Sequence, residues 1–186
     1  MKEKRLEILG ILSVAVSLLI FTSLIGYNPN EDPGISPNIL IENPMGILGV
    51  WIGYFFIKLT FGYSSFIIPF IAITWGIWFF SNKDFQAISR LSGYLSGLVV
   101  LSSITLGAAQ IFRYGIDNVS YRFSGMIGGL IAGMIFDFLG AIGILIILIS
   151  LWLILVRGYF GFSFYKPIKL LIDNYKKKQA DKKLVT

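Results

Sequence analysis

The chain has 186 residues, of which 55% are hydrophobic and 14% are charged, with a net charge of +6. Soluble proteins carry about 25% charged residues, so this composition excludes an ordinary soluble domain and indicates an integral membrane protein. The chain contains neither cysteine nor histidine, which excludes thiol redox chemistry, metal sites built from these residues and catalytic triads that use histidine.

A first membrane span is predicted at residues 8–27, which carry no charge and are long enough to cross a bilayer. A cleaved signal peptide is the alternative, because it also begins with basic residues before an apolar run. The apolar run is longer than a usual signal core, and residues 22–26 lack a clear cleavage pattern. We therefore favour an uncleaved anchor.

The next stretch, from Asn28 to Pro44, is predicted to be a turn-rich loop. Its four prolines fix φ and remove backbone donors, and its asparagines favour turns. The loop contains Glu31, Asp32 and Glu42 but neither lysine nor arginine. Because cytoplasmic loops are enriched in basic residues, this loop is predicted to lie on the non-cytoplasmic side.

Residues 45–80 are apolar apart from Lys58 and are too long for one span. As one helix they would be nearly twice as long as the roughly 30 Å hydrocarbon core, whereas two full spans would not fit. We therefore predict a short helix over 45–58, marked by Gly46 and Gly49, and a span over 61–80. Gly62 provides the bend between them.

The second half follows the same plan. A third span is predicted over 91–112, and a short helix over 124–136 precedes a fourth span over 138–156, with Asp137 as the one charge in that stretch. The predicted fold class is therefore all-α, with four transmembrane helices and two short interfacial or half helices on the outer side. Residues 1–165 form this membrane domain, and residues 166–186 form a basic cytoplasmic tail.

Most of the basic residues lie at the two chain ends and in the turn over 81–90, which a four-span topology places on one side. Both termini are therefore predicted to be cytoplasmic. Aromatic residues precede the lysines of the tail, which is typical of contact with an anionic membrane surface. Contact with nucleic acid is the alternative, since lysines neutralise phosphates of any sequence.

The two halves are interpreted either as two parallel repeats or as segments that are similar only in composition. Lys58 lies twelve residues after Gly46, and Asp137 lies twelve residues after Gly125, so they form either a pair or two separate interfacial charges. We favour separate charges. For the two short helices we predict a position flat along the membrane interface, and the alternative is that they dip into the bilayer. The matched positions are Gly46 with Gly125, Gly49 with Gly128, and Gly62 with Gly140.

Gly129 and Gly133 form a G-x-x-x-G pair, which lets helices approach closely. This pair indicates either internal packing or a contact between subunits. No G-x-x-x-x-G-K-[ST] sequence occurs, so the chain lacks a P-loop for nucleotide phosphates. No acid, base and nucleophile come together along the sequence, and we expect no catalytic residue, no cofactor and no metal site.

From about residue 5 to residue 165, the chain resembles the N-terminal four-span membrane domain of the FtsK/SpoIIIE bacterial DNA translocases. The resemblance rests on a loop that opens with an Asn-Pro pair and continues with an Asp-Pro pair, and on glycine-spaced segments. These residues are Asn28, Pro29, Asp32 and Pro33 in the loop, Asn43 with Gly46 and Gly49, then Gly62, then Gly125 with Gly128, and Gly140 with Gly143.

The resemblance implies a non-enzymatic anchor in the bacterial inner membrane, located at the division septum and serving cell division and chromosome partition. It also implies membrane lipids, other division proteins and further copies of the chain as partners. The motor that moves DNA is expected to lie outside this chain, so contact with DNA would be indirect. The alternatives are a small channel or transporter subunit, and an accessory membrane protein without a septal role.

Overall fold

The computed structural model describes residues 2–31, 33, 41–81, 85–116 and 120–161, and this part of the chain contains helices and turns but no strand. The predicted tail lies outside the described residues. Two compact units are present, residues 1–151 and residues 152–186. The elements in chain order are α1 (Lys2–Ile25), α2 (Gly46–Gly53), η1 (Tyr54–Phe61), η2 (Gly62–Phe66), α3 (Ile67–Ser81), α4 (Phe85–Tyr114) and α5 (Tyr121–Phe160).

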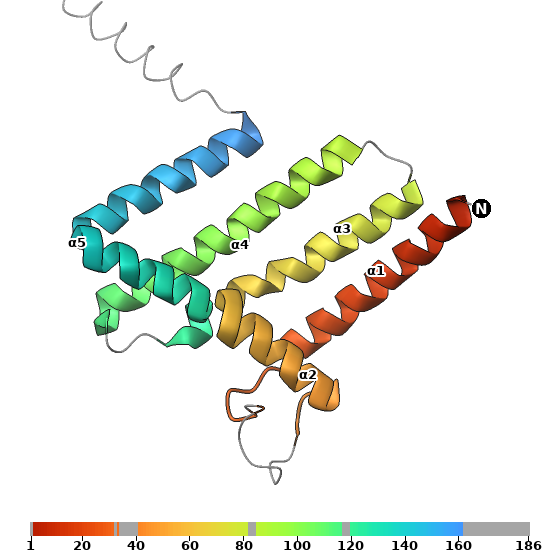
Figure 1. The fold of residues 1–186 in the computed structure, drawn as a ribbon, viewed down its shortest axis with the longest axis horizontal. Coiled ribbons are helices and arrows are strands. Elements are labelled where there is room, and N and C mark those ends of the chain that lie inside the picture. The colour runs from red at the N-terminus through yellow and green to blue at the C-terminus, as the bar shows by residue number, and fades with distance from the viewer. Residues whose placement is uncertain (1, 32, 34–40, 82–84, 117–119, 162–186) are drawn as a thin grey trace, which may run out of the picture. The chain divides into compact units, whose positions relative to one another are not determined.

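The long helices of the first unit lie side by side, with α1 against α3 and α3 against α4 (Figure 1). Two shorter pieces, α2 with η1 and the beginning of α5, lie at the end of the unit where α1 ends (Figure 1). The arrangement matches the all-α, four-span fold class that the sequence predicts.

Small residues bring α1 and α3 close together. A Cβ atom on Gly10 would be 3.1 Å from the carbonyl oxygen of Gly76, and a Cβ on Gly76 would be 3.1 Å from that of Gly10. The hydroxyl of Ser13 donates to the carbonyl of Ala72 at 2.8 Å, and the fully buried Ser17 donates to Pro69 at 2.5 Å. Close backbone approach and interhelical hydrogen bonds are the usual means of joining helices in lipid.

Each half contains one short helix bounded by two glycines with positive φ. α2 and η1 together form the first short helix (46–61), and the first part of α5 forms the second short helix (126–139), before the chain bends into the fourth span (141–160). The φ values are 62° at Gly46, 63° at Gly62, 67° at Gly125 and 69° at Gly140. Glycine reaches this region at little cost, whereas other residues are strained there.

The helix bounds differ from the predicted spans mainly at helix ends. α1 begins at Lys2 rather than at residue 8, and α4 begins at Phe85 rather than at residue 91. These additional turns carry polar and charged side chains, which a search for apolar runs leaves out. The first short helix extends to residue 61 because its second part, η1, is a π-helix that continues to Gly62.

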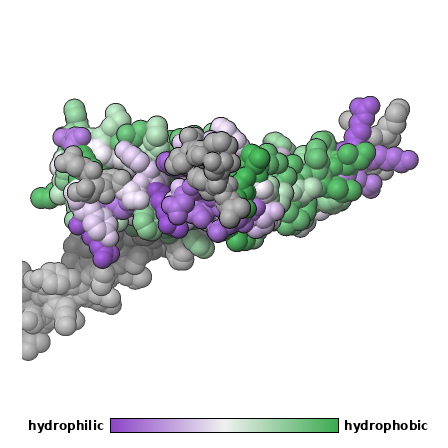
Figure 2. Space-filling model, turned by 90° about the horizontal axis from the view of Figure 1, so that it is seen from below, coloured by the Kyte–Doolittle hydropathy of each residue, from purple (hydrophilic) through white to green (hydrophobic). Residues whose placement is uncertain are grey.

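The outer surface of the first unit is apolar along its helices. Ile8 is 64% exposed and Ile142 is 75% exposed, with many further exposed isoleucine, leucine and phenylalanine side chains. Figure 2 shows hydrophilic residues gathered at the end that faces the viewer and hydrophobic residues along the adjoining flank. Apolar patches of this extent are a liability in water, but a bilayer solvates them.

Candidate functional site

The ends of the two short helices meet at Gly62 and Gly125. A Cβ on Gly62 would overlap the backbone nitrogen of Gly125 and the carbonyl oxygen of Phe123. A Cβ on Gly125 would overlap the backbone nitrogen of Gly62 and the carbonyl oxygen of Thr60. Because the backbones touch and both residues have positive φ, neither position tolerates a side chain. We call this contact the glycine junction.

Aromatic and cationic side chains flank the glycine junction. The rings of Tyr63 and Phe123 pack edge to face, with centroids 5.5 Å apart, and the guanidinium of Arg122 lies 5.6 Å from the Tyr63 ring centroid. Such contacts contribute about 0.5–1.5 kcal/mol beyond the area that they bury. The residues next to each glycine in sequence therefore reinforce the backbone contact.

Two serines of α4 connect the third span to both sides of the glycine junction. The hydroxyl of Ser102 donates to that of Ser64 at 2.9 Å, and the fully buried Ser103 donates to the carbonyl of Ser124 at 2.5 Å. Ser64 belongs to η2 and Ser124 directly precedes Gly125. α4 thus contacts the first half through one hydroxyl and the second half through the next.

The second short helix packs closely on α4 because glycines line the contact. A Cβ on Gly107 would be 2.9 Å from the carbonyl of Gly128, and a Cβ on Gly128 would overlap the hydroxyl of Ser103. Ala132, which is fully buried, continues the same face one turn later. This explains the predicted importance of Gly125-x-x-Gly128: the first glycine makes the bend and the second makes room for α4.

The first short helix is attached to α1 through the side chain of Asn43. Its side-chain amide donates to the carbonyl of Ser23 on α1 at 3.0 Å, and its side-chain oxygen accepts from the backbone N–H of Met45 at 3.0 Å. A Cβ on Gly49 would overlap that oxygen. Asn43-x-x-Gly46-x-x-Gly49 is therefore a packing unit in which Asn43 attaches the first short helix to α1.

The two glycines of the G-x-x-x-G pair, Gly129 and Gly133, lie in different environments. Gly129 is buried, and a Cβ there would be 3.0 Å from the Tyr121 ring, so its small size serves packing inside the unit. Gly133 is only partly buried, and a Cβ there would be 4.0 Å from Ile116. A role for Gly133 in a contact between subunits stays a prediction.

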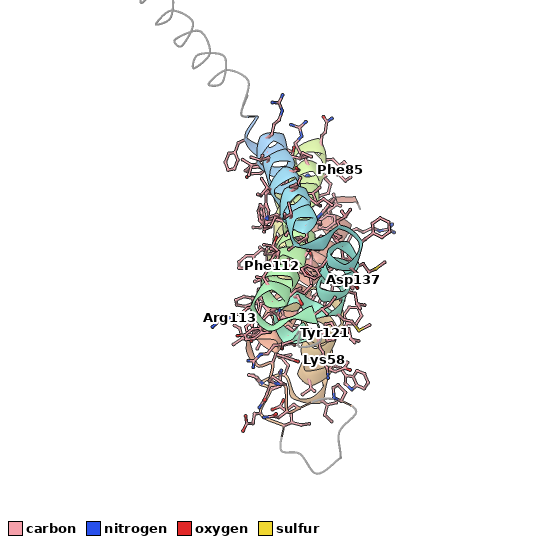
Figure 3. The ribbon with its side chains drawn as sticks, turned by 90° about the vertical axis from the view of Figure 1, so that its left-hand side faces the viewer. Lys58, Phe85, Phe112, Arg113, Tyr121 and Asp137 are labelled. Atoms are coloured by element: carbon pink, nitrogen blue, oxygen red, sulfur yellow. The ribbon has the colours of Figure 1, made fainter. Side chains whose placement is uncertain are left out.

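Lys58 and Asp137 are not joined by an ion pair in the described part of the chain. The ammonium of Lys58 lies 4.9 Å from the centroid of the Tyr54 ring, one turn earlier in the first short helix. Figure 3 shows Asp137 near the level of Phe112 and Lys58 near the level of Tyr121. That the two charges act separately stays a prediction.

The outer loop begins with a tight turn. The N–H of Glu31 donates to the carbonyl of Asn28 at 3.0 Å, with Pro29 in the second position of the turn, where its fixed φ is favourable. The side-chain oxygen of Asn28 accepts from the N–H of Asn30 at 3.1 Å. Pro33 is partly buried, and Asp32 lies outside the described residues.

Sequence reasoning did not identify the buried hydroxyls as site residues. Ser17, Ser23, Ser65, Ser103 and Ser124 are all fully buried in the described part of the chain. The available signal was the presence of serine within otherwise apolar spans, because a hydroxyl in hydrocarbon requires a partner. Which partner each one uses depends on the packing of the helices.

These observations define a class of protein. Four helical stretches are long and apolar enough to cross a membrane: Lys4–Ile25, Gly46–Ser81, Phe85–Tyr114 and Tyr121–Phe160. Their hydroxyl and glycine contacts are those of helices packed in lipid. The protein is a multi-pass helical membrane protein.

The family then follows from comparison with known proteins. The model of the family described as the 4TM region of DNA translocase FtsK/SpoIIIE matches residues 3–171. The chain belongs to this family. The matched region is the membrane part of such translocases rather than their motor. Neither the search of curated proteins nor the search of solved structures gives a match.

Proposed function

We infer that this chain is the membrane anchor of a DNA translocase that serves cell division and chromosome segregation. The observation that carries the proposal is the family match over residues 3–171, which includes all four membrane-spanning stretches. The chain itself supplies attachment and position, and the motor activity belongs to another part of the translocase. The chain is not itself an enzyme in this proposal.

The distribution of charge supports a defined orientation. The outer loop from Asn28 to Pro44 has no basic residue, whereas lysines and arginines gather at both ends of the chain. By the positive-inside rule, both termini face the cytoplasm of a bacterial cell and both short helices face outward. A translocase motor attached to a cytoplasmic end would then have access to DNA.

The proposed location is the division septum in the inner membrane. There the partners are lipids, other membrane proteins of the division machinery and further copies of this chain. The exposed apolar faces provide the surface for such contacts, because helix association in lipid depends on packing rather than on a hydrophobic driving force. DNA is contacted only through the motor.

A channel or transporter subunit is the second candidate, and Lys58 and Asp137 are the observations that favour it. The groove between α3 and α4 counts against it. This groove has a volume of about 350 Å³, and its lining is apolar except for Ser96: Phe61, Ile68, Ile71, Ala72, Ser96, Val99 and Val100. Such a lining fits an acyl chain better than a hydrated solute.

Fluorescence imaging of a tagged copy in dividing cells tests the proposal. A lipid dye and an unrelated four-span protein with the same tag serve as controls for the doubled membrane at the septum. The proposal predicts septal enrichment above both controls. An even distribution around the cell would contradict it, and solute flux through liposomes that contain the purified chain would support the transporter instead.

A further inference from the structure

Glu31 is a buried carboxylate with one unused oxygen. Its side chain is only 6% exposed. One carboxylate oxygen, Oε1, accepts the backbone N–H of Glu42 at 2.8 Å. The other, Oε2, is buried and has no hydrogen-bond partner in the described part of the chain. A buried carboxylate oxygen without a partner destabilises the folded state, because it loses its hydrogen bonds to water and forms none within the protein.

The groups around Glu31 are themselves rich in oxygen. The carboxylate of Glu42 accepts from the side-chain amide of Asn28 at 3.4 Å, and the carbonyl of Asn28 accepts the N–H of Glu31 at 3.0 Å. Asn28, Glu31 and Glu42 therefore form one connected cluster, which we call the loop cluster. Its hydrogen bonds link a glutamate at the start of the outer loop to one at the end.

The outer loop and the two described helix segments next to it carry no basic side chain. The loop over 28–44 contains no lysine or arginine. The last two turns of α1 and all of α2, which pack together next to the loop, contain no charged residue. The loop cluster therefore has no cationic partner on these neighbouring segments, and the Oε2 atom of Glu31 is shielded from solvent.

We propose that the loop cluster binds a divalent cation, with Ca²⁺ as the best match. Its ligands are oxygens, which hard cations prefer, and no cysteine or histidine occurs in the chain to favour zinc. Ca²⁺ accepts six to eight oxygen ligands in irregular geometry, whereas Mg²⁺ demands a regular octahedron. Glu31 Oε2 and the Glu42 carboxylate provide the charged ligands, and backbone carbonyls and water complete the shell.

The affinity is expected to be low. No group of three or more acidic side chains gathers in the part of the chain that the structure describes, so two carboxylates carry the charge of the site. Extracellular calcium modules of modest charge bind with dissociation constants of about 0.1–1 mM. We expect the dissociation constant of the loop cluster to lie in this range. The fraction of chains with bound Ca²⁺ would then follow the calcium concentration outside the cell.

Cation binding would fix the first short helix. Glu42 directly precedes Asn43, whose side chain attaches this helix to α1 through the carbonyl of Ser23. A cation held by Glu31 and Glu42 joins the two ends of the outer loop and restricts Asn43. The loop cluster would therefore make the stability of the first half depend on external calcium, whether or not the chain has a septal role.

Calorimetric titration of the full chain, purified in a nonionic detergent and freed of metal, tests this inference. Ca²⁺ is added to the wild type and to the E31Q, E42Q and E7Q variants. E7Q is the matched control, because Glu7 is an exposed carboxylate on α1. The thermal unfolding midpoint is measured in parallel from 0 to 10 mM Ca²⁺, and size-exclusion chromatography checks that each variant is folded.

The inference predicts one Ca²⁺ per chain for the wild type and for E7Q, with an unfolding midpoint that rises and saturates over this range. E31Q and E42Q should bind at least tenfold more weakly and lose the rise in midpoint. If E31Q does not fold, E42Q decides the outcome. No binding by the wild type, unchanged binding in the folded variants, or Mg²⁺ binding as tight as Ca²⁺ binding would each overturn the assignment.

Discussion

Gly62 and Gly125 touch backbone to backbone, and through this contact the end of the first short helix meets the beginning of the second. Both residues have positive φ, at 63° and 67°. The two short helices are therefore joined at two positions where a side chain does not fit. The side chains of Tyr63, Arg122 and Phe123 pack around the contact, and the serines of α4 hold its two sides.

Replacing either junction glycine with alanine should strongly destabilise the protein. A backbone conformation that alanine rarely adopts costs about 1–3 kcal/mol, and the overlap of the new Cβ with backbone atoms adds to this cost. The unfolding midpoint of the purified Gly62→Ala and Gly125→Ala variants in detergent measures the effect. Both midpoints should fall well below that of the wild type.

Gly93→Ala is the matched control for the junction variants. Gly93 is an exposed residue of α4, and a Cβ there would meet no atom within 4 Å. Since alanine favours a helix by up to about 1 kcal/mol over glycine, this variant should be as stable as the wild type or more stable. Equal behaviour of the Gly62, Gly125 and Gly93 variants would refute the proposed role of the junction.

Ser103→Ala should weaken the contact between α4 and the second short helix. The substitution removes the hydrogen bond to the carbonyl of Ser124 but keeps the small shape that fits against Gly128. Interhelical hydrogen bonds in membrane proteins contribute about 0.6 kcal/mol on average and up to about 1.7 kcal/mol. Because Ser103 is fully buried, we expect a loss near the upper end in the free energy of unfolding.

Ser150→Ala provides the comparison for Ser103→Ala. Ser150 is exposed, and its hydroxyl donates to the carbonyl of Ile146 in its own helix at 2.8 Å. Its removal should change the free energy of unfolding by less than about 0.5 kcal/mol. A loss as large as that of Ser103→Ala would mean that burial and interhelical contact do not matter here.

Asn43→Ala should loosen the first short helix from α1. The variant leaves the carbonyl of Ser23 and the N–H of Met45 without their partners, and each unpaired buried group costs about 1–3 kcal/mol. The unfolding midpoint should therefore fall. Asn30→Ala, in the same loop but with an exposed side chain, should leave the midpoint unchanged, and similar losses in both variants would contradict the assignment.

Lys58 and Asp137 should contribute independently to stability. A double-mutant cycle of Lys58→Met and Asp137→Asn should give a coupling energy below about 0.5 kcal/mol, because the structure shows no ion pair between them in the described residues. Lys58→Met alone should cost about 0.5–1 kcal/mol, since it removes the contact with the Tyr54 ring. A coupling energy above about 1 kcal/mol would restore the pair hypothesis.

The sequence predicts the four spans and the positions of the bends because length, charge and glycine spacing are local properties. The spacing of the glycines matches Gly46 with Gly125 and Gly62 with Gly140, and all four residues have positive φ in the structure. The sequence could not predict that Gly62 contacts Gly125 instead of a residue of its own half. Contacts between distant segments depend on how whole helices pack, which no local pattern specifies.

The same limit explains the residues that sequence reasoning missed. Ser17 and Ser103 look like ordinary small residues within apolar runs, and only the packed helices reveal the carbonyls that they reach. Nothing in the residue types of the outer loop marks Glu31 for burial, yet its side chain is only 6% exposed. Burial is a property of the fold, so residue type and spacing alone did not distinguish Glu31 from Glu42.

In the proposed topology, both polar loops and both short helices lie on one side of the membrane, and both chain ends lie on the other. Because the chain has no cysteine, single cysteines can be introduced and labelled in intact cells with a maleimide that does not cross the inner membrane. Asn30→Cys and Ile116→Cys should be labelled, whereas Lys4→Cys and Gln86→Cys should be labelled only after permeabilisation. Labelling of Asn30→Cys but not of Ile116→Cys, or labelling of Lys4→Cys in intact cells, would contradict this topology.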